Sequence, residues 1–456
     1  MQALPEFPAG FRWGAATSAY QIEGAAALDG RGRSIWDTFS HSEGRTSGGA
    51  TGDVACDHYR RWPQDVALLA GLGADTYRFS VAWPRIQPDG TGPANKPGLD
   101  FYDELVDGLL GSAIVPIPTL YHWDLPQALQ DEGGWLNRQT AYRFAEYAAL
   151  VADRLGDRVK TWITLNEPFI HMAFGYALGV HAPGLDLGIE ALPAAHHQLL
   201  GHGLAVAELR ERGLKVAIAN NCSPVRSISD TEYDRAAADA YDTLHNRLFN
   251  DPILLGRYPD LSAFGEPGVP PFVQDGDLEL ISQPVDLLGI NYYSPTLVGR
   301  PDRDVAPEAG PLPFALHEID GVPTTAFGWP VVPEGLTDLL VGLRDRYGDA
   351  LPPIMITENG CSTDDTVDAD GHIRDAARIE YLDGHLRAVH AAITAGVDVR
   401  GYLTWSLIDN FEWAEGFTQR FGLVRVDFDT LERTPKDSYD WFRAVIAAQP
   451  GRSALS

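Results

Sequence analysis

The feature of this sequence that most restricts its fold is a repeated alternation of short apolar segments with longer helix-like segments. The short segments contain β-branched and other apolar residues and run into polar turns, which is typical of buried strands. They are Phe11–Ala16, Ala74–Ser80, Ile114–Tyr121, Lys160–Leu165, Lys215–Ala219, Val285–Asn291, Pro353–Thr357 and Val399–Trp405. The helix-like segments include Gln139–Leu155, Ala191–Arg212, Thr231–Leu248, Glu334–Tyr347 and Asp375–Ala395. This alternation predicts an α/β fold, a parallel (β/α)8 TIM barrel.

A doubly wound open sheet is the alternative architecture for such an alternation. That fold usually has a glycine-rich phosphate loop after its first strand, whereas FRWGAATS at residues 11–18 contains no G-x-G-x-x-G motif. A length of 456 residues also allows several domains. However, no Pro/Ser-rich linker separates two halves, and α/β barrels often run this long. We therefore expect residues 1–456 to form one barrel domain.

Two segments fit neither the strand nor the helix pattern. Arg300–Gly328 is rich in Gly and Pro and exceeds the usual length of a connection. We expect it to be a functional loop on one face of the barrel rather than a linker. Ser40–Thr51 is similarly rich in Gly, Ser and Thr, and we expect it at the surface.

The charge of the chain argues against two classes of partner. The formal net charge is -28, and so negative a surface repels phosphate backbones and anionic lipid headgroups. We therefore expect no nucleic-acid and no membrane partner, and no uninterrupted apolar run is long enough to span a bilayer. The first residues, MQALPEFPAGFRW, lack the pattern of a secretory signal. Cys56, Cys222 and Cys361 are far apart and match no disulfide or zinc spacing. These observations favour a cytoplasmic protein.

Polar and aromatic side chains follow almost every predicted strand. In a (β/α)8 barrel the carboxyl ends of all strands meet at one mouth, where chemistry takes place. Any one such residue is explained as a helix cap or a solvated turn residue, but that explanation does not cover the whole set. The set includes Gln21, Arg78, Trp83, Tyr121, His122, Trp123, Asp124, Asn166, Glu167, Asn291, Tyr292, Tyr293, Glu358, Asn359, Trp405, Glu412 and Trp413.

This collection suits a sugar ligand. Indole and phenol faces stack on the C–H faces of a pyranose ring, while amides, imidazole and carboxylates bond its hydroxyl groups. Two carboxylates on opposite walls would provide the acid and the nucleophile of glycoside hydrolysis. Only His122 among the strand-end residues is a histidine, so a metal-dependent barrel hydrolase is disfavoured and we expect no metal and no cofactor.

Several motifs of the chain resemble the signature segments of glycoside hydrolase family 1. They are FRWGAATSAYQIEGA at residues 11–25, TLNEP at residues 164–168 and ITENG at residues 356–360. YHWDLPQAL, NYYS and LTWSLIDNFEWAEGF extend the resemblance along the whole chain in the order expected of the family. Each motif alone is weak, but together they are specific. The resemblance implies a retaining exo-β-glycosidase of the β-glucosidase type, acting by double displacement.

The resemblance implies that Glu167 is the acid/base and Glu358 the nucleophile. The residues themselves favour the same assignment. Arg78 and Tyr293 resemble the family's partners of the nucleophile, and a cation and a phenol beside Glu358 would keep it ionised. Glu167 faces an anion without such a partner, so its pKa should be raised. A salt bridge within the barrel layers is an alternative role for Arg78. Asn166 is suited to hold the sugar 2-hydroxyl.

The resemblance also implies a substrate-binding set. The sugar that is released would contact Gln21, His122, Asn166, Glu412 and Trp413, with Trp405 beneath it, and Trp123, Asn291 and Tyr293 belong to the same set. Trp329 resembles the aromatic residue that stacks on the leaving group. Core packing is the alternative explanation for His122 and the tryptophans. Glu412 would bond the 4- and 6-hydroxyls and repel a phosphate, which argues against a 6-phospho-β-glucosidase.

Several points stay open at this stage. A non-catalytic sugar-binding barrel is disfavoured because both glutamates are present. The expected partner is a small β-glucoside or cello-oligosaccharide, which implies a role in cellulose and polysaccharide degradation. The residues do not decide between glucose, fucose and galactose. They also leave open the natural leaving group and the oligomeric state.

Overall fold

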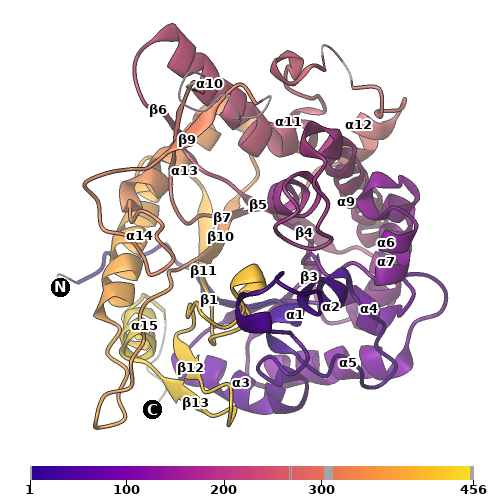
Figure 1. The fold of residues 1–456 in the computed structure, drawn as a ribbon. Coiled ribbons are helices and arrows are strands. Elements are labelled where there is room, and N and C mark those ends of the chain that lie inside the picture. Colours follow the sequence, from indigo (N-terminus) through magenta and orange to yellow (C-terminus); the bar gives the residue numbers. More distant parts are fainter. Residues whose placement is uncertain (1–2, 267, 269, 302–311, 452–456) are drawn as a thin grey trace.

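Eight parallel strands close into a barrel at the centre of the molecule (Figure 1). The computed structural model describes residues 3–266, 268, 270–301 and 312–451. Around the barrel the order is β1-β11-β10-β7-β5-β4-β3-β2. The strands are β1 (Arg12–Ala16), β2 (Thr76–Ser80), β3 (Val115–Tyr121), β4 (Thr161–Asn166), β5 (Lys215–Asn221), β7 (Leu287–Asn291), β10 (Ile354–Asn359) and β11 (Val399–Trp405). The predicted (β/α)8 barrel is confirmed, and every predicted strand overlaps an observed one.

Helices surround the barrel (Figure 1). The long ones are α3 (His58–Leu72), α5 (Lys96–Gly111), α7 (Gln139–Leu155), α9 (Leu192–Glu211), α10 (Glu232–Asp242), α11 (Leu248–Leu255), α13 (Pro333–Tyr347), α14 (Ala376–Thr394) and α15 (Asp437–Ala447). Shorter ones are α1 (Ala19–Ile22), α2 (Ile35–Ser40), α4 (Trp83–Ile86), α6 (Gln127–Asp131), α8 (Pro168–Ile170) and α12 (Asp277–Ile281). None of the helices within the described residues is long and apolar enough to cross a membrane.

Local sequence explains how these helices and strands pack. In α7, Phe144, Tyr147, Ala148 and Val151 are fully buried, and their three- and four-residue spacing makes one apolar face of a helix. The barrel interior is filled by apolar side chains from several strands, including Ile117, Ile163, Met355 and Leu403. Gly14 lets β1 approach β2 closely, because a Cβ atom there would lie 1.8 Å from the Thr76 carbonyl oxygen.

The structure refines two sequence-based expectations. The predicted helix-like segment Thr231–Leu248 is helical, but its α-helix, α10, ends at Asp242, and Thr243–Arg247 forms a π-helical turn, η5. Arg300–Gly328 is not entirely a loop. Residues 302–311 lie outside the described residues, but β9 (Ala315–His317) pairs with β8 (Thr296–Gly299), which also pairs with β6 (Val225–Ser227). Hydrogen bonding between these strands therefore orders part of the predicted loop.

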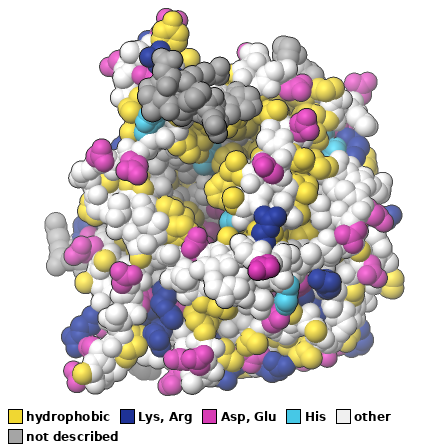
Figure 2. All heavy atoms as spheres, in the orientation of Figure 1, with side chains coloured by type: hydrophobic (Ala, Val, Ile, Leu, Met, Phe, Trp, Pro, Cys, Tyr) yellow, Lys and Arg dark blue, Asp and Glu magenta, His cyan; other side chains and the backbone are white. Residues whose placement is uncertain are grey.

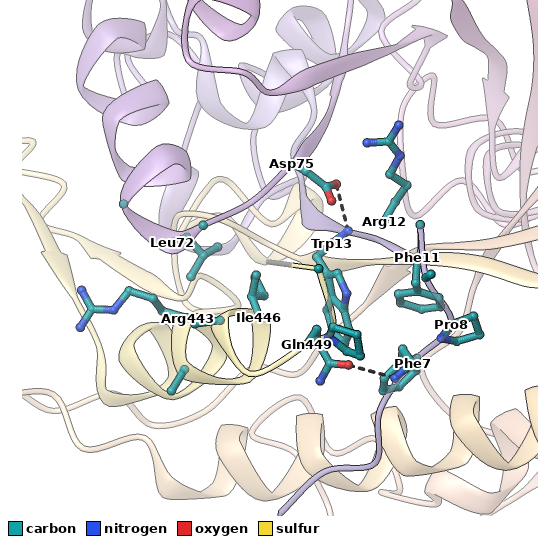
Figure 3. A pocket seen from close by; sticks show the side chains of 18 residues that line it. Phe7, Pro8, Phe11, Arg12, Trp13, Leu72, Asp75, Arg443, Ile446 and Gln449 are labelled. Atoms are coloured by element: carbon teal, nitrogen blue, oxygen red, sulfur yellow. Dashed lines mark hydrogen bonds between the residues drawn. The ribbon is translucent and has the colours of Figure 1, made fainter. Parts of the chain in front are cut away.

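A broad hollow of about 800 Å³ lies at the opposite end of the barrel from the strand carboxyl ends. It lies between the N-terminal segment and the end of α15 (Figure 3). The Phe7 backbone N–H donates to Gln449 Oε1, and the Trp13 N–H donates to Asp75 Oδ1. Phe7, Phe11 and Trp13 form an aromatic cluster there. These contacts connect the two ends of the described chain, and barrel enzymes use this face for stability.

A buried group of charges holds the segment after β11 in place. The ammonium group of Lys436 contacts the carboxylates of Asp365 and Asp409, and all three side chains are completely buried. Arg420 donates to Asp409 Oδ2 at 2.7 Å, and Arg378 contacts Asp365. A short hairpin of β12 (Val424–Val426) and β13 (Arg433–Pro435) completes this region. The charges therefore position the loop that carries Glu412 and Trp413.

Replacing Lys436 with Met should destabilise the protein. Two carboxylates would stay buried with one cation fewer, and removing one partner of a buried ion pair costs roughly 3–5 kcal/mol. We expect the melting temperature of Lys436→Met to fall by roughly 5 °C or more, measured by calorimetry. Lys215→Met, at an exposed lysine, is the control and should melt near the wild-type temperature. Equal melting temperatures for both variants would contradict this role.

Candidate active site

One cavity opens at the carboxyl ends of the barrel strands. It has a volume of about 470 Å³, and Figure 2 shows a hollow on this face with hydrophobic side chains along part of its edge. Nine of the predicted site residues line it: His122, Trp123, Glu167, Tyr293, Trp329, Glu358, Trp405, Glu412 and Trp413. Gln21, Arg78, Asn166 and Asn291 are bonded to these residues or to one another. The structure therefore brings the predicted set together.

Arg78 lies at the centre of this group. Its Nη1 donates to Glu358 Oε1 at 2.6 Å, its Nη2 to Asn166 Oδ1 at 2.5 Å and its Nε to Thr119 Oγ1 at 3.0 Å. Tyr293 donates its hydroxyl proton to Glu358 Oε2 at 2.8 Å. Both carboxylate oxygens of Glu358 are thus occupied by donors. Such an arrangement fixes the orientation of the carboxylate and favours its charged form.

The carboxyl group of Glu167 has a different environment. Two amides donate to its Oε1: Asn291 Nδ2 at 2.9 Å and Asn221 Nδ2 at 3.1 Å. Burial, followed by the neighbouring charge of Glu358, raises the pKa of Glu167 to about 8. The carboxyl group is therefore protonated at neutral pH, as its position facing an anion predicts.

The two glutamates lose their protons at different pH values. Burial also raises the pKa of Glu358 above its ordinary value, while Arg78 and Tyr293 act in the opposite direction. The cost of burying the charge exceeds the combined effect of these two neighbours on the pKa. Among the described residues, a guanidinium pairs with Glu358 and none pairs with Glu167. Glu358 is therefore the carboxyl group that ionises at the lower pH.

The inner part of the cavity combines aromatic faces with polar atoms. The His122 ring lies against Trp405 and Trp413, with centroids 5.9 and 5.8 Å apart. His122 Nε2 accepts from Asn166 Nδ2 at 3.0 Å, so Nδ1 carries the proton. That Nδ1 is buried and has no hydrogen-bond partner within the described residues.

Glu412 lines another part of the cavity and is bonded to the buried Gln21. Gln21 Nε2 donates to Asn410 Oδ1 at 3.0 Å, to the Phe411 carbonyl at 2.9 Å and to Glu412 Oε2 at 3.3 Å. Burial and the charges of Glu358 and Glu167 raise the pKa of Glu412 to about 8. The cavity therefore contains three mutually repelling carboxyl groups, and at neutral pH it holds fewer than three negative charges.

Three residues of the site have strained backbone conformations. Trp123, Glu167 and Trp413 have φ angles of 72°, 45° and 51°. A positive φ is uncommon outside glycine, and such residues cluster where the surrounding structure imposes a particular side-chain direction. Glu167 occupies this conformation immediately before Pro168, which begins α8. The turn directs the carboxyl group into the cavity instead of along the continuing chain.

Comparisons with known proteins identify the family of this chain. The family model described as "Glycosyl hydrolase family 1" matches residues 4–450. The chain belongs to glycosyl hydrolase family 1. It is 49% identical to the bifunctional β-D-glucosidase/β-D-fucosidase of Bifidobacterium breve, over 98% of this chain and 99% of the relative. It is 51% identical to thermostable β-glucosidase B of Thermobispora bispora, over 96% of this chain and 90% of the relative.

The structural comparison agrees with the sequence comparison. The solved β-glucosidase of Thermotoga maritima in complex with glucoimidazole superimposes with a TM-score of 0.91 at 44% identity, covering 97% of this chain and 98% of that chain. The predicted fold and the predicted enzyme class, a family 1 glycoside hydrolase of the β-glucosidase type, are confirmed.

The outer part of this family 1 cavity is mainly apolar. Ile170, Phe174 and Val180, which follow β4, line one side, and Phe327 and Trp329 line another. Phe327 and Trp329 stack with centroids 4.4 Å apart. The structure thus places Trp329 at the outer side of the mouth, at the end of the long connection.

Sequence analysis missed the contribution of strand five. The predicted strand ended at Ala219, whereas β5 continues to Asn221, and Asn221 lines the cavity and bonds Glu167. A strict application of the strand-end rule to the Asn220-Asn221 pair would have found it. His245, from the π-helical turn η5, also lines the cavity, and no sequence motif indicated it.

Replacing Arg78 with Met should raise the pKa of Glu358 further. The guanidinium is the strongest influence opposing burial at this carboxyl group, so its removal favours the protonated form. The measurement is a pH titration of glutamate side-chain ¹³C signals, with Glu358→Gln identifying the signal. Arg85→Met, at a buried arginine that pairs with Glu23, is the matched control. An unchanged titration of Glu358 in Arg78→Met would contradict this prediction.

Proposed function

We propose that this chain is a retaining exo-β-glucosidase, with Glu358 as nucleophile and Glu167 as acid/base. The observation that supports the proposal best is that two buried carboxyl groups in one cavity have different ion-pair and hydrogen-bond partners. Glu358 contacts Arg78 and accepts a hydrogen bond from the Tyr293 hydroxyl, while the described partners of Glu167 are neutral amides, and burial with the charge of Glu358 raises the pKa of Glu167 to about 8. A pair of glutamates with separated pKa values supplies an anion and an acid at the same pH.

In the first step Glu358 attacks the anomeric carbon of the bound β-glucoside. A covalent glycosyl ester forms, the bond to the leaving oxygen breaks, and Glu167 transfers its proton to that oxygen. The negative charge of Glu358 disappears as the ester forms. Since that charge contributes to the raised pKa of Glu167, this pKa falls, and Glu167 becomes ready to act as a base.

In the second step the deprotonated Glu167 takes a proton from water. The water oxygen attacks the anomeric carbon, the ester bond to Glu358 breaks, and glucose leaves with its original β configuration. Asn166, held by Arg78 through Oδ1, would bond the 2-hydroxyl, a contact that strengthens as positive charge develops on the sugar.

The glucose unit would occupy the inner part of the cavity. Gln21, His122 and Glu412 would bond its hydroxyl groups, while Trp405 and Trp413 would lie against its C–H faces. Trp123, Asn291 and Tyr293 complete this wall, and Trp329 would contact the leaving group. The apolar outer walls favour an aryl or other hydrophobic leaving group, alongside the second glucose of a cello-oligosaccharide.

A phosphorylated sugar fits the cavity poorly. The basic residue that follows the Glu412 loop, Arg420, is held by Asp409 and the Val426 carbonyl and lies over the Phe428 ring. It is therefore committed to the buried charge group. The raised pKa of Glu412 weakens the argument from carboxylate repulsion below about pH 8. The lack of an available cation near this carboxyl group, within the described residues, supports an unphosphorylated substrate.

Other parts of the proposal concern the cellular role. We propose one catalytic domain over residues 1–456, a small β-glucoside or cello-oligosaccharide as substrate, and a role in cellulose degradation. We also propose a cytoplasmic location. The three cysteines, which are free and buried, suit a reducing compartment. Among the described residues, no group of three or more His, Cys, Asp or Glu side chains is arranged to hold a metal ion.

The test of the nucleophile is Glu358→Ala with and without azide. The covalent step then has no attacking group, so turnover of an aryl β-glucoside should fall by roughly five orders of magnitude. Azide should occupy the vacated space, restore partial turnover and give an α-glucosyl azide, detected by NMR. A β-configured azide product, or near-wild-type turnover without azide, would exclude Glu358 as the nucleophile.

The test of the acid/base is Glu167→Gln with two leaving groups. A dinitrophenolate leaves without a proton, whereas a phenolate needs one, so cleavage of the phenyl β-glucoside should suffer far more. The expected ratio of the two losses in kcat/KM is roughly a hundredfold. Equal losses for both substrates would point to a folding defect or to a different acid.

A further inference from the structure

A chain of four hydrogen-bonded side chains runs from the outer barrel to the carboxyl group of Glu167. The hydroxyl oxygen of Tyr241 lies 3.0 Å from His245 Nδ1, and His245 Nε2 lies 2.8 Å from Asn221 Oδ1. Asn221 Nδ2 lies 3.1 Å from Glu167 Oε1. Tyr241 belongs to α10, His245 to η5 and Asn221 to the end of β5. The contacts thus connect a peripheral helix to the catalytic centre.

The chemistry of these groups determines which atom donates and which accepts in each of these hydrogen bonds. Glu167 Oε1 receives amide N–H groups from both Asn221 and Asn291, so it acts as an acceptor and carries no proton. The acidic proton of Glu167 is therefore on Oε2. With its NH₂ group facing Glu167, Asn221 presents its carbonyl oxygen to His245, which must donate from Nε2. His245 Nδ1 then accepts the Tyr241 hydroxyl proton.

His245 is suited to this role because it is neutral and enclosed. Burial lowers its pKa to about 4, so it holds one proton, and the Asn221 carbonyl oxygen, which can only accept, requires that Nε2 carries it. Its ring also stacks on Phe169, with centroids 4.0 Å apart and planes 19° apart. This stacking fixes the plane of the imidazole, and with it the direction of the Nε2–H bond.

We infer that His245 is a positioning residue for catalysis. Its Nε2–H holds the Asn221 amide with the NH₂ group towards Glu167, which keeps the acidic proton on Oε2, the oxygen that receives no hydrogen bond from the described residues. Without this anchor Asn221 is free to rotate by half a turn and present its carbonyl oxygen. The protonated carboxyl group would then donate to Asn221 from Oε1 instead of to the leaving oxygen. This inference rests on the proposed acid/base role of Glu167.

Two variants separate the hydrogen bond from the ring stacking. His245→Phe keeps an aromatic ring against Phe169 and removes the donor to Asn221. His245→Gln removes the ring and keeps an N–H donor. If His245 only packs against Phe169, the Gln variant should be the more impaired. If it acts through Asn221, the Phe variant should be.

The readout is the ratio of kcat/KM for phenyl β-glucoside to that for dinitrophenyl β-glucoside, measured across pH. Both substrates depend on Glu358 and Glu412, but only the phenyl substrate depends on the acid. The ratio therefore isolates Glu167 from the other ionisable groups around it, which are Glu358, Glu412, Arg78, Tyr293 and Cys222. The dinitrophenyl rate by itself also reports whether a variant is folded.

In His245→Phe we expect the ratio near neutral pH to fall by about tenfold, since the proton is then directed away from the substrate. Loss of the amide donor also removes a group that stabilises the carboxylate, so the pKa of Glu167 rises. The decline of the ratio at alkaline pH should accordingly shift to a higher pH, by roughly one pH unit. His245→Gln should retain most of the wild-type ratio and the wild-type alkaline pH dependence.

The inference would be overturned if His245→Phe kept the wild-type ratio of kcat/KM values and the wild-type alkaline pH dependence. It would also be overturned if the ratio fell equally in the Phe and Gln variants. A different result would refute the proposed function itself. If Glu167→Gln shows no dependence on the leaving group, Glu167 is not the acid. If Glu167→Gln shows that dependence and His245→Phe behaves like the wild type, only the role of His245 is lost.

Discussion

The buried contact between Arg78 and Glu358 is the interaction on which the rest of the site depends. Taking both charges out of water is costly, and their attraction offsets that cost only where further hydrogen bonds satisfy the remaining polar atoms. Here the guanidinium of β2 bonds Thr119 of β3, Asn166 of β4 and Glu358 of β10, and Tyr293 bonds the second carboxylate oxygen. A closed barrel can hold four strand ends at the required separations, because each strand is bonded on both edges.

The same contact separates the properties of the two glutamates. Both are buried in one cavity, and burial alone would raise both pKa values. Arg78 opposes that effect directly at Glu358, and the charge that Glu358 then carries raises the pKa of Glu167. Burial is thus the main reason that Glu167 keeps its proton, and Arg78 is the main influence that favours the charge on Glu358. The amide of Asn291 acts on both groups and moderates both shifts.

Features that depend on local sequence could be predicted, whereas features that depend on contacts between distant residues could not. Strand existence followed from local apolar patterns, so the barrel and most of the mouth residues were predictable. The π-helical turn at Thr243–Arg247 was not, because helix propensity does not distinguish an α-helical from a π-helical turn. Asn221 was missed by an error of two residues in the end of a strand, the least reliable part of such a prediction. His245 and Tyr241 reach the site only through the packing of α10 and η5 against the barrel.

The sequence by itself determined the order of strands and helices, and hence which residues follow each strand and meet at one mouth. Its motifs also determined the family, since each lies at its own strand end. Only the tertiary structure decided the protonation states and the hydrogen-bond directions. The pKa of Glu167 depends on burial and on a charge 191 positions away in the chain, at Glu358. The commitment of Arg420 to Asp409 likewise depends on side chains that meet only in the folded barrel. Electrostatic interactions act through space, so a linear pattern of residues does not contain them.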